Sequence, residues 1–137
     1  MDLHKLSLSK QLEGLKKRDF TSTELTSHYL NRISKLDGQL NSFITVTEDQ
    51  AFSQAKAADD RYKTNNNFPI DGLPIAHKDI FCTKGVLTTC GSKMLSNFKA
   101  PYSSTVYVKL DKNGMVMLGK TNMDEFAMGS STVSYTH

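Results

Sequence analysis

The sequence has no tryptophan, three prolines and two cysteines, Cys82 and Cys90, among its 137 residues. Two cysteines are too few for a disulfide-stabilised scaffold, and free thiols are typical of a reducing compartment. No apolar run approaches the roughly 18 residues that a membrane-spanning helix needs. Residues 1–15 also lack the hydrophobic region of a secretion signal. We therefore expect a soluble, cytoplasmic protein with no membrane partner.

The sequence also lacks an excess of charge of one sign. It has 17 Lys and Arg residues and 14 Asp and Glu residues, which gives a net charge of +3. Charge this weak and scattered does not favour a nucleic-acid groove or a patch for a membrane surface. At about 150 residues per domain, the length fits one domain or part of one. A complete barrel enzyme or a two-domain dehydrogenase is excluded.

Residues 1–65 have the patterns of a helical region. Apolar residues recur at helical spacing over residues 8–15, which predicts a first helix. Thr21 and Glu24 have the spacing of a capping box, in which a hydroxyl and a carboxylate each bind a free N–H group at a helix start. They predict a second helix, with Gly38 just past its end.

A short β-rich segment, residues 42–46, follows this helix. Alanine and tyrosine then recur at helical spacing over residues 51–62, which predicts a third helix that packs closely on its neighbours. Three consecutive asparagines, residues 65–67, have the composition of a linker, and the pattern changes after them.

Residues 69–137 have the pattern of an α/β unit. We expect a strand over residues 73–77, a helix over 104–112 and a buried strand over 115–118. A helix that connects two strands favours a parallel pair. Between the first strand and the helix we expect a loop with one helical turn.

One stretch, residues 114–121, satisfies the phosphate-binding-loop pattern GxxxxGK[ST] letter for letter. A phosphate cradle needs a loop between its two glycines, so that backbone N–H groups converge on the anion. Here the intervening residues are all apolar and are predicted to form a strand. We interpret the match as coincidental, with Lys120 and Thr121 merely leaving the strand. Histidine and cysteine spacings do not match a zinc site, and no metal is expected.

Lys78 is the most informative single residue, because it follows a predicted strand. Ligands collect at the ends of strands in α/β folds. Desolvation there favours the uncharged amine, which can act as a general base. The alternative is an ordinary solvated lysine beside Asp79. A second cluster comprises residues 123–132. A short helix is predicted over residues 122–128, opened by Thr121 or Asn122. The helix leads into a Gly-Ser-Ser loop, which could bind a substrate or could be a simple polar helix exit.

Several longer strings carry a resemblance to a known family. They are TSTEL (21–25), LNSFI (40–44), GLPIAHKDIFCTKG (72–85), TTCGSKML (88–95) and GKTNMDEFAMGSST (119–132). Together they resemble the amidase signature family, and within it the A subunits of the tRNA-dependent amidotransferases. The resemblance implies a truncated α/β amidase signature fold, in which N-terminal helices precede the start of a mixed sheet covered by helices. Residues 1–137 would be the N-terminal part of a single domain, helical over 1–65 and α/β over 69–137.

The resemblance also implies a reaction and its residues. The family hydrolyses amides with a Ser–cis-Ser–Lys triad, and Lys78 matches the lysine by motif position. Both triad serines lie in a later glycine- and serine-rich region, so the 137 residues alone are expected to be inactive. The residues that match the loop near the glutamine pocket are Met128, Gly129, Ser130 and Ser131. The end of the sequence, residues 133–137, departs from the family pattern.

For the complete protein the resemblance implies partners. The ammonia released from glutamine would pass to a B subunit, which amidates misacylated Glu-tRNA(Gln) or Asp-tRNA(Asn) in an assembly with a small C subunit. ATP and magnesium would bind at a partner subunit, and no cofactor is expected in this chain. Two alternatives stay open, namely another amidase acting on a small carboxamide and a non-catalytic docking fragment.

Overall fold

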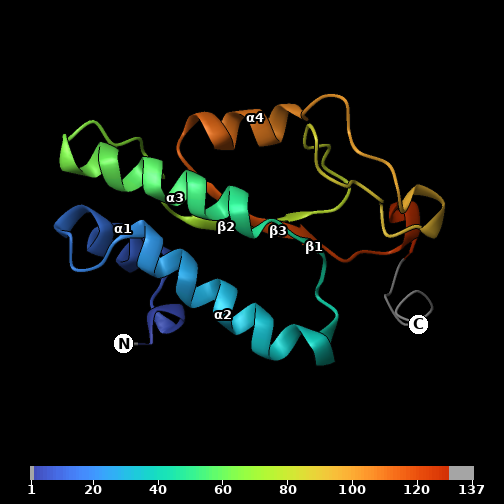
Figure 1. The fold of residues 1–137 in the computed structure, drawn as a ribbon, viewed down its shortest axis with the longest axis horizontal. Helices are drawn as coiled ribbons and strands as arrows, with labels where there is room; N and C mark the ends of the chain where they lie inside the picture. Colours follow the sequence, from blue (N-terminus) through green and yellow to red (C-terminus); the bar gives the residue numbers. More distant parts are fainter. Residues whose placement is uncertain (1, 130–137) are drawn as a thin grey trace.

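A computed structural model describes residues 2–129 of the chain. The elements in chain order are η1 (Leu3–Lys5), α1 (Leu8–Lys17), α2 (Ser22–Leu40), β1 (Phe43–Val46), α3 (Glu48–Lys63), β2 (Pro74–Lys78), η2 (Lys93–Leu95), α4 (Thr105–Lys112), β3 (Val116–Thr121) and η3 (Glu125–Ala127). Helices α1 and α2 lie on one side of the strands and α4 lies on the other (Figure 1). The predicted α/β class is confirmed.

The start of α2 follows its predicted chemistry. The Thr21 side chain accepts from the Glu24 backbone N–H at 3.0 Å, and the Glu24 carboxylate accepts from the Thr21 N–H at 2.7 Å. The predicted end at Gly38 is wrong, because α2 continues to Leu40 and ends at Asn41 in the left-handed conformation. Asp37 stabilises this later end, since its carboxylate accepts from two backbone N–H groups after the helix.

The three strands form one mixed sheet in the order β1-β3-β2. Strand β3 is central, pairs antiparallel with β1 and pairs parallel with β2, as the strand–helix–strand pattern predicts. In the register of the parallel pair, His77 lies beside Lys120 and Lys78 lies beside Thr121. The last residues of both strands therefore meet at the same end of the sheet.

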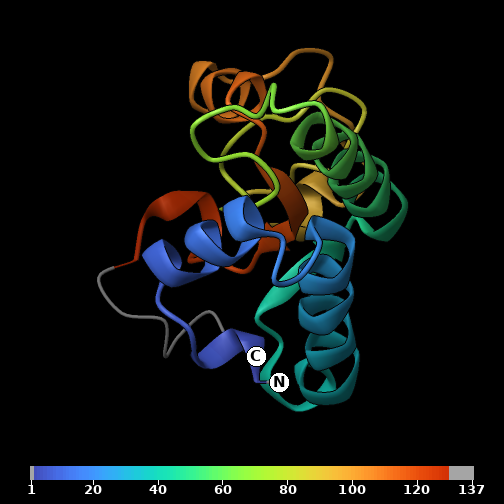
Figure 2. The same ribbon diagram turned by 90° about the vertical axis from the view of Figure 1, so that its left-hand side faces the viewer.

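Both faces of β3 are buried, which is why its sequence reads as a continuous apolar run. One face packs against α2 and α3 through Leu30, Ala51, Ala55, Val116 and Leu118. The other face packs against α4 through Tyr107, Met115 and Met117. The alanine spacing of α3 is confirmed as a packing face, because small side chains let the helix approach the strand closely. Figure 2 shows α2 and α3 from the end of the molecule, packed on their side of the strands.

The turn before β2 holds an ion pair whose carboxylate is buried and whose arginine is partly exposed. Asp71 is fully buried, and its two carboxylate oxygens accept from Arg61 Nε at 2.8 Å and from Arg61 Nη2 at 2.6 Å. Gly72 has a φ of +75°, and a Cβ there would lie 2.8 Å from the Ser22 side chain. The Asp71-Gly72 turn thus leads directly into β2, and the pair holds the turn against α3.

The segment after β3 differs from its prediction. Thr121 belongs to β3, and the expected helix over residues 122–128 is only the single turn η3. Phe126 has φ 52° and ψ 23°, which interrupts helical geometry. Its backbone N–H binds the Cys90 carbonyl oxygen at 2.9 Å, so a contact with a distant loop replaces the intrahelical bond. Within residues 2–129, no helix is long and apolar enough to cross a membrane.

Candidate active site

The ends of β2 and β3 meet two loops at one end of the sheet. The long connection after β2 and the turn after β3 gather there (Figure 1). The carboxyl ends of parallel strands are where α/β proteins bind ligands. Lys78 is the last residue of β2 and Thr121 is the last residue of β3, so the predicted lysine lies at this end.

Lys78 points to the opposite side of the strand from its two neighbours. His77 and Asp79 are buried, whereas Lys78 is exposed. Successive strand residues face opposite sides of a sheet, so Lys78 shares its side with Pro74 and Ala76. The expectation of a buried amine is wrong for the described residues, because β2 is an edge strand and Lys78 faces away from its packed side.

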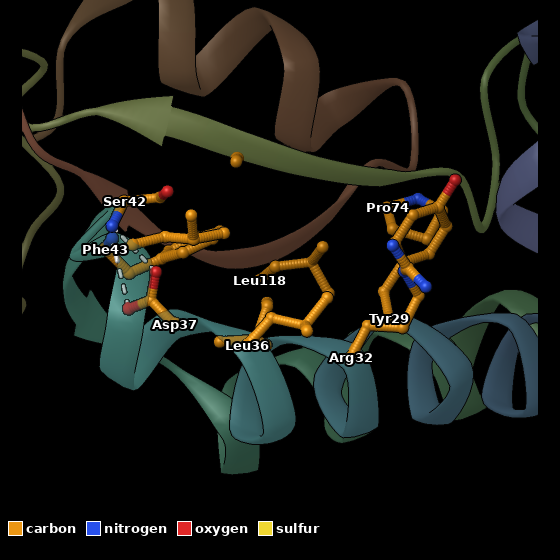
Figure 3. A pocket seen from close by; sticks show the side chains of 11 residues that line it. Tyr29, Arg32, Leu36, Asp37, Ser42, Phe43, Pro74 and Leu118 are labelled. Carbon is orange, nitrogen blue, oxygen red and sulfur yellow. Dashed lines mark hydrogen bonds between the residues drawn. The ribbon is translucent and has the colours of Figure 1, made fainter.

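A groove of about 350 Å³ lies on the side of β2 that carries Pro74 and Ala76, between α2 and the sheet. Figure 3 shows Arg32 and neighbouring α2 side chains facing Pro74 and Leu118 across it. Asp37 closes one end through its hydrogen bonds to the backbone that leads into β1. Within residues 2–129, the groove leaves this side of the edge strand β2 open and largely apolar, whereas the same side of β3 is covered by α2 and α3.

The opposite side of the strand ends holds a buried lysine, Lys120. Its side chain is 0% exposed. The amine Nζ donates to the Phe81 carbonyl oxygen at 2.7 Å and to Thr88 Oγ1 at 3.2 Å, and lies 3.3 Å from Asp79 Oδ1. The expectation that Lys120 simply leaves the strand is therefore wrong, because its side chain points into the interior.

Asp79 connects this lysine to the next loop. Its Oδ2 accepts from the Thr89 backbone N–H at 2.9 Å and from Thr89 Oγ1 at 2.5 Å. Its own backbone N–H donates to the Thr121 carbonyl oxygen at 3.1 Å. Burial lowers the pKa of the Lys120 amine, and the nearby Asp79 carboxylate opposes this shift by stabilising the ammonium form. The pair therefore ties β3, the end of β2 and the following loop together.

The same geometry explains the false phosphate loop. Residues 116–121 form a strand, as the apolar run predicts, and Lys120 Nζ is surrounded by three protein acceptors. Gly119 is required for strand packing, since a Cβ there would lie 2.3 Å from the Thr45 carbonyl oxygen. Gly119 and Lys120 are therefore strand residues and do not have the loop geometry of an anion cradle.

Strained backbone is concentrated where the two loops meet. Six non-glycine residues between positions 2 and 129 have a positive φ, and three of them follow the ends of helices: Arg18, Asn41 and Asn65. The other three lie in the two loops: Cys90, Phe126 and Ala127. Such conformations cost about 1–3 kcal/mol each and cluster at functional sites. This loop junction is therefore the second component of the candidate site.

The predicted substrate loop begins at this junction. Met128 is 75% exposed, and Gly129 lies against Asp124, where an added Cβ would be 2.5 Å from the carboxyl carbon. Ser130 and Ser131 lie outside the described residues. The Phe126 N–H binds the Cys90 carbonyl oxygen, and the Cys90 N–H binds the Asp79 carbonyl oxygen at 3.2 Å. Two backbone bonds thus link the turn before Met128 to the residue that follows Lys78.

His77 is buried beside this network without a hydrogen bond at Nε2. Its ring packs against Phe81 and Tyr107, with centroids 6.3 Å and 5.4 Å away. Burial lowers the pKa of His77, and the charge of Lys120 lowers it further. Among residues 2–129, no group of three or more histidine, cysteine or acidic side chains is placed to hold a metal ion.

Because the pKa of His77 is lowered in the folded chain, we expect the free energy of unfolding to depend on pH. The unfolded chain binds a proton near the ordinary pKa of 6.5, whereas the folded chain resists it. The free energy of unfolding is therefore expected to fall as pH drops from about 7.5 to about 5.5. His28, whose pKa burial also lowers, acts in the same direction. Urea midpoints at the two pH values test this, and H77F should show a smaller drop. An unchanged or rising midpoint in the unmodified chain would contradict it.

Known proteins are similar to this chain in sequence. A family model described as Amidase matches residues 24–137. The A subunit of glutamyl-tRNA(Gln) amidotransferase from Pseudomonas entomophila is 59% identical over 132 residues, which cover 96% of this chain and 27% of that protein. The protein of the same name from Psychrobacter cryohalolentis is 56% identical over 133 residues, with 97% and 27% covered. The chain thus spans about a quarter of the length of these curated relatives.

Solved structures share the fold. One chain superposes with a TM-score of 0.89 at 31% identity. It comes from a vestigial protein complex that reveals the evolutionary origins of an s-triazine catabolic enzyme. That match covers 95% of this chain and 29% of the other. The native peptide amidase from Stenotrophomonas maltophilia superposes with a TM-score of 0.83 at 28% identity, covering 89% of this chain and 26% of the amidase.

Proposed function

Because the chain belongs to the amidase signature family, we propose that it forms the N-terminal part of the glutamine-hydrolysing A subunit of a tRNA-dependent amidotransferase. The observation that carries the proposal is the likeness to curated A subunits over nearly the whole chain. The position of Lys78 supports it, since a lysine at the end of a strand in an α/β sheet lies where such folds bind ligands.

In the proposed reaction Lys78 is the proton acceptor. Its Nζ takes the proton of one serine hydroxyl, which in turn takes the proton of a nucleophilic serine. The nucleophile forms a bond to the amide carbon of glutamine, the C–N bond breaks and ammonia leaves with the returned proton. Water then releases glutamate from the acyl-enzyme. Both serines would come from sequence outside these 137 residues, on the open side of β2 that Lys78 faces.

The loop that begins at Met128 and Gly129, and continues to Ser130 and Ser131, is proposed to line the glutamine pocket. Backbone N–H groups in such a loop can hold the developing oxyanion. The strained Phe126-Ala127 turn supports this role, because it fixes the point from which the loop departs.

The complete protein is proposed to work with partners. Ammonia passes to the B subunit, where ATP and magnesium support amidation of misacylated Glu-tRNA(Gln), and a small C subunit completes a heterotrimer in the cytoplasm. This chain would meet tRNA only through the B subunit, which agrees with its net charge of only +3. Asp-tRNA(Asn) is the alternative acceptor.

Ammonia release from glutamine tests the proposal. The complete protein, assembled with its B and C partners, is expected to release ammonia from glutamine, whereas residues 1–137 alone should release none, because they supply the proton acceptor without a nucleophile. An assembled complex that releases no ammonia would contradict the proposal. Release by residues 1–137 alone would contradict the assignment of both serines to a later region.

The likeness to a peptide amidase structure supports a second candidate function, the hydrolysis of peptide amides. Substrate preference distinguishes it from glutamine hydrolysis. Hydrolysis of peptide amides without partner subunits, at a rate above that for glutamine, would favour this second function. Binding to B and C subunits without hydrolysis of either substrate would indicate a docking role only.

A further inference from the structure

We propose that Lys120 is a positioning residue for amide hydrolysis, because its buried amine fixes the strand end that carries Lys78. The inference rests on the proposed function, in which Lys78 accepts the proton. Lys120 itself is fully buried and touches no solvent-facing surface, so it acts through its neighbours.

The contacts of Lys120 lie immediately after Lys78. Its Nζ reaches the Asp79 carboxylate at 3.3 Å and the Phe81 carbonyl oxygen at 2.7 Å, which are one and three residues further along the chain. Thr88 supplies a third acceptor at 3.2 Å. Two of these contacts are hydrogen bonds, to Phe81 and Thr88, and the third is a charge contact with Asp79 Oδ1, which has no hydrogen-bond partner of its own among the described residues. With Asp79 held inward, strand alternation turns Lys78 outward to the groove side.

The network continues to the predicted substrate loop. The Asp79 carboxylate accepts twice from Thr89, and its carbonyl oxygen accepts from the Cys90 N–H. The Cys90 carbonyl oxygen then accepts from the Phe126 N–H at 2.9 Å. One buried pair therefore anchors both the proton acceptor and the turn before Met128, and its loss should shift them relative to one another.

The chain offers a control in a second ion pair with a buried carboxylate. Asp71 is fully buried like Asp79, and its partner Arg61 is partly exposed, whereas Lys120 is fully buried. This pair lies before β2 begins, at the opposite end of the strand from Lys78. Breaking it leaves a buried carboxylate without its partner but does not release the strand end that carries Lys78.

The experiment compares K120M and R61M in the assembled amidotransferase, with glutamine as substrate. For K120M we expect kcat to fall about 100-fold, the effect of a roughly 1 Å misplacement of a reacting group. KM should rise much less than kcat falls, because the misplaced proton acceptor acts on the reaction step whereas the shifted loop affects only part of the glutamine contacts. For R61M we expect a lower thermal midpoint but a kcat within about twofold of the unmodified complex.

A double variant separates positioning from stability. D79N/K120M removes both charges, so it should recover thermal stability relative to K120M while kcat stays low. If K120M does not fold, T88V removes one acceptor of Nζ at nearly constant volume and should lower kcat several-fold without loss of folding.

The outcomes are distinct. A low kcat in K120M and in the double variant, with normal kcat in R61M, supports the inference. Recovery of kcat together with stability in the double variant, or unaffected kcat in K120M and T88V, overturns it and leaves the proposed function standing. An unmodified complex that releases no ammonia overturns the proposed function, and this inference with it.

Discussion

Replacing Lys78 by alanine in the complete protein is expected to abolish measurable ammonia release from glutamine. A general base contributes about 10²–10⁴-fold to a rate, and here the same amine starts the relay that activates the nucleophile. Within residues 2–129 the side chain is exposed and makes no hydrogen bond, so its removal should leave the fold intact. Steady-state ammonia release by K78A, with circular dichroism and thermal midpoint beside it, measures both effects.

Lys84 provides the control for this substitution. It is an exposed lysine in the loop after β2, and only its backbone N–H is engaged, with Ser103 Oγ at 3.0 Å. K84A should therefore release ammonia at the unmodified rate. A K78A complex that keeps its turnover would show that Lys78 is not the base, whereas equal losses in both variants would indicate a general effect of lysine removal.

Replacing Asp79 by alanine is expected to cause the largest loss of stability of any single change discussed here. Lys120 would remain fully buried without its counter-charge, and Thr89 would lose the acceptor for its N–H and hydroxyl groups. Removing one partner of a buried pair costs about 3–5 kcal/mol. Urea unfolding should show a correspondingly lower midpoint with a nearly unchanged m-value.

An exposed ion pair provides the control for this substitution. Asp60 contacts Lys63 at 2.9 Å, but both side chains are largely exposed. Exposed pairs contribute little because water screens them. D60A should therefore keep the unmodified midpoint. A D79A chain as stable as D60A would show that the Lys120 pair does not hold the strand ends together.

Local patterns predicted most of the fold. The Thr21–Glu24 spacing is confirmed as a capping box, and the alanine spacing of α3 is confirmed as a packing face. The strand–helix–strand order predicted the parallel pairing of β2 and β3. Each of these features follows from a pattern within a single element or from the order of neighbouring elements along the chain. The same holds for the placement of Lys78 at a strand end.

The buried network could not be predicted in the same way. Lys120 is buried because Asp79, Phe81 and Thr88 come to it from far away in the sequence. A signal was present, since a lysine within an apolar strand needs an opposite charge, and Asp79 directly follows the neighbouring strand. The phosphate-loop pattern describes a lysine at the end of a loop, so it does not indicate the pairing of Lys120 with Asp79.

The turn after β3 shows a second limit. The sequence predicts a helix over residues 122–128, but the Phe126 N–H binds the Cys90 carbonyl oxygen and the chain bends. Glu125 accepts from the Ser92 hydroxyl at 2.7 Å. Both partners belong to the loop after β2, so a tertiary contact overrides the local preference.

A crystal structure of the complete protein with glutamine bound tests the central claim most directly. If Lys78 starts the proton relay, its Nζ should lie about 2.6–3.2 Å from a serine hydroxyl, the distance that proton transfer requires. That serine should come from a segment packed against the open side of β2, which would shield the amine from bulk water. A Lys78 amine that still faces solvent, with no serine hydroxyl within reach, would contradict the claim.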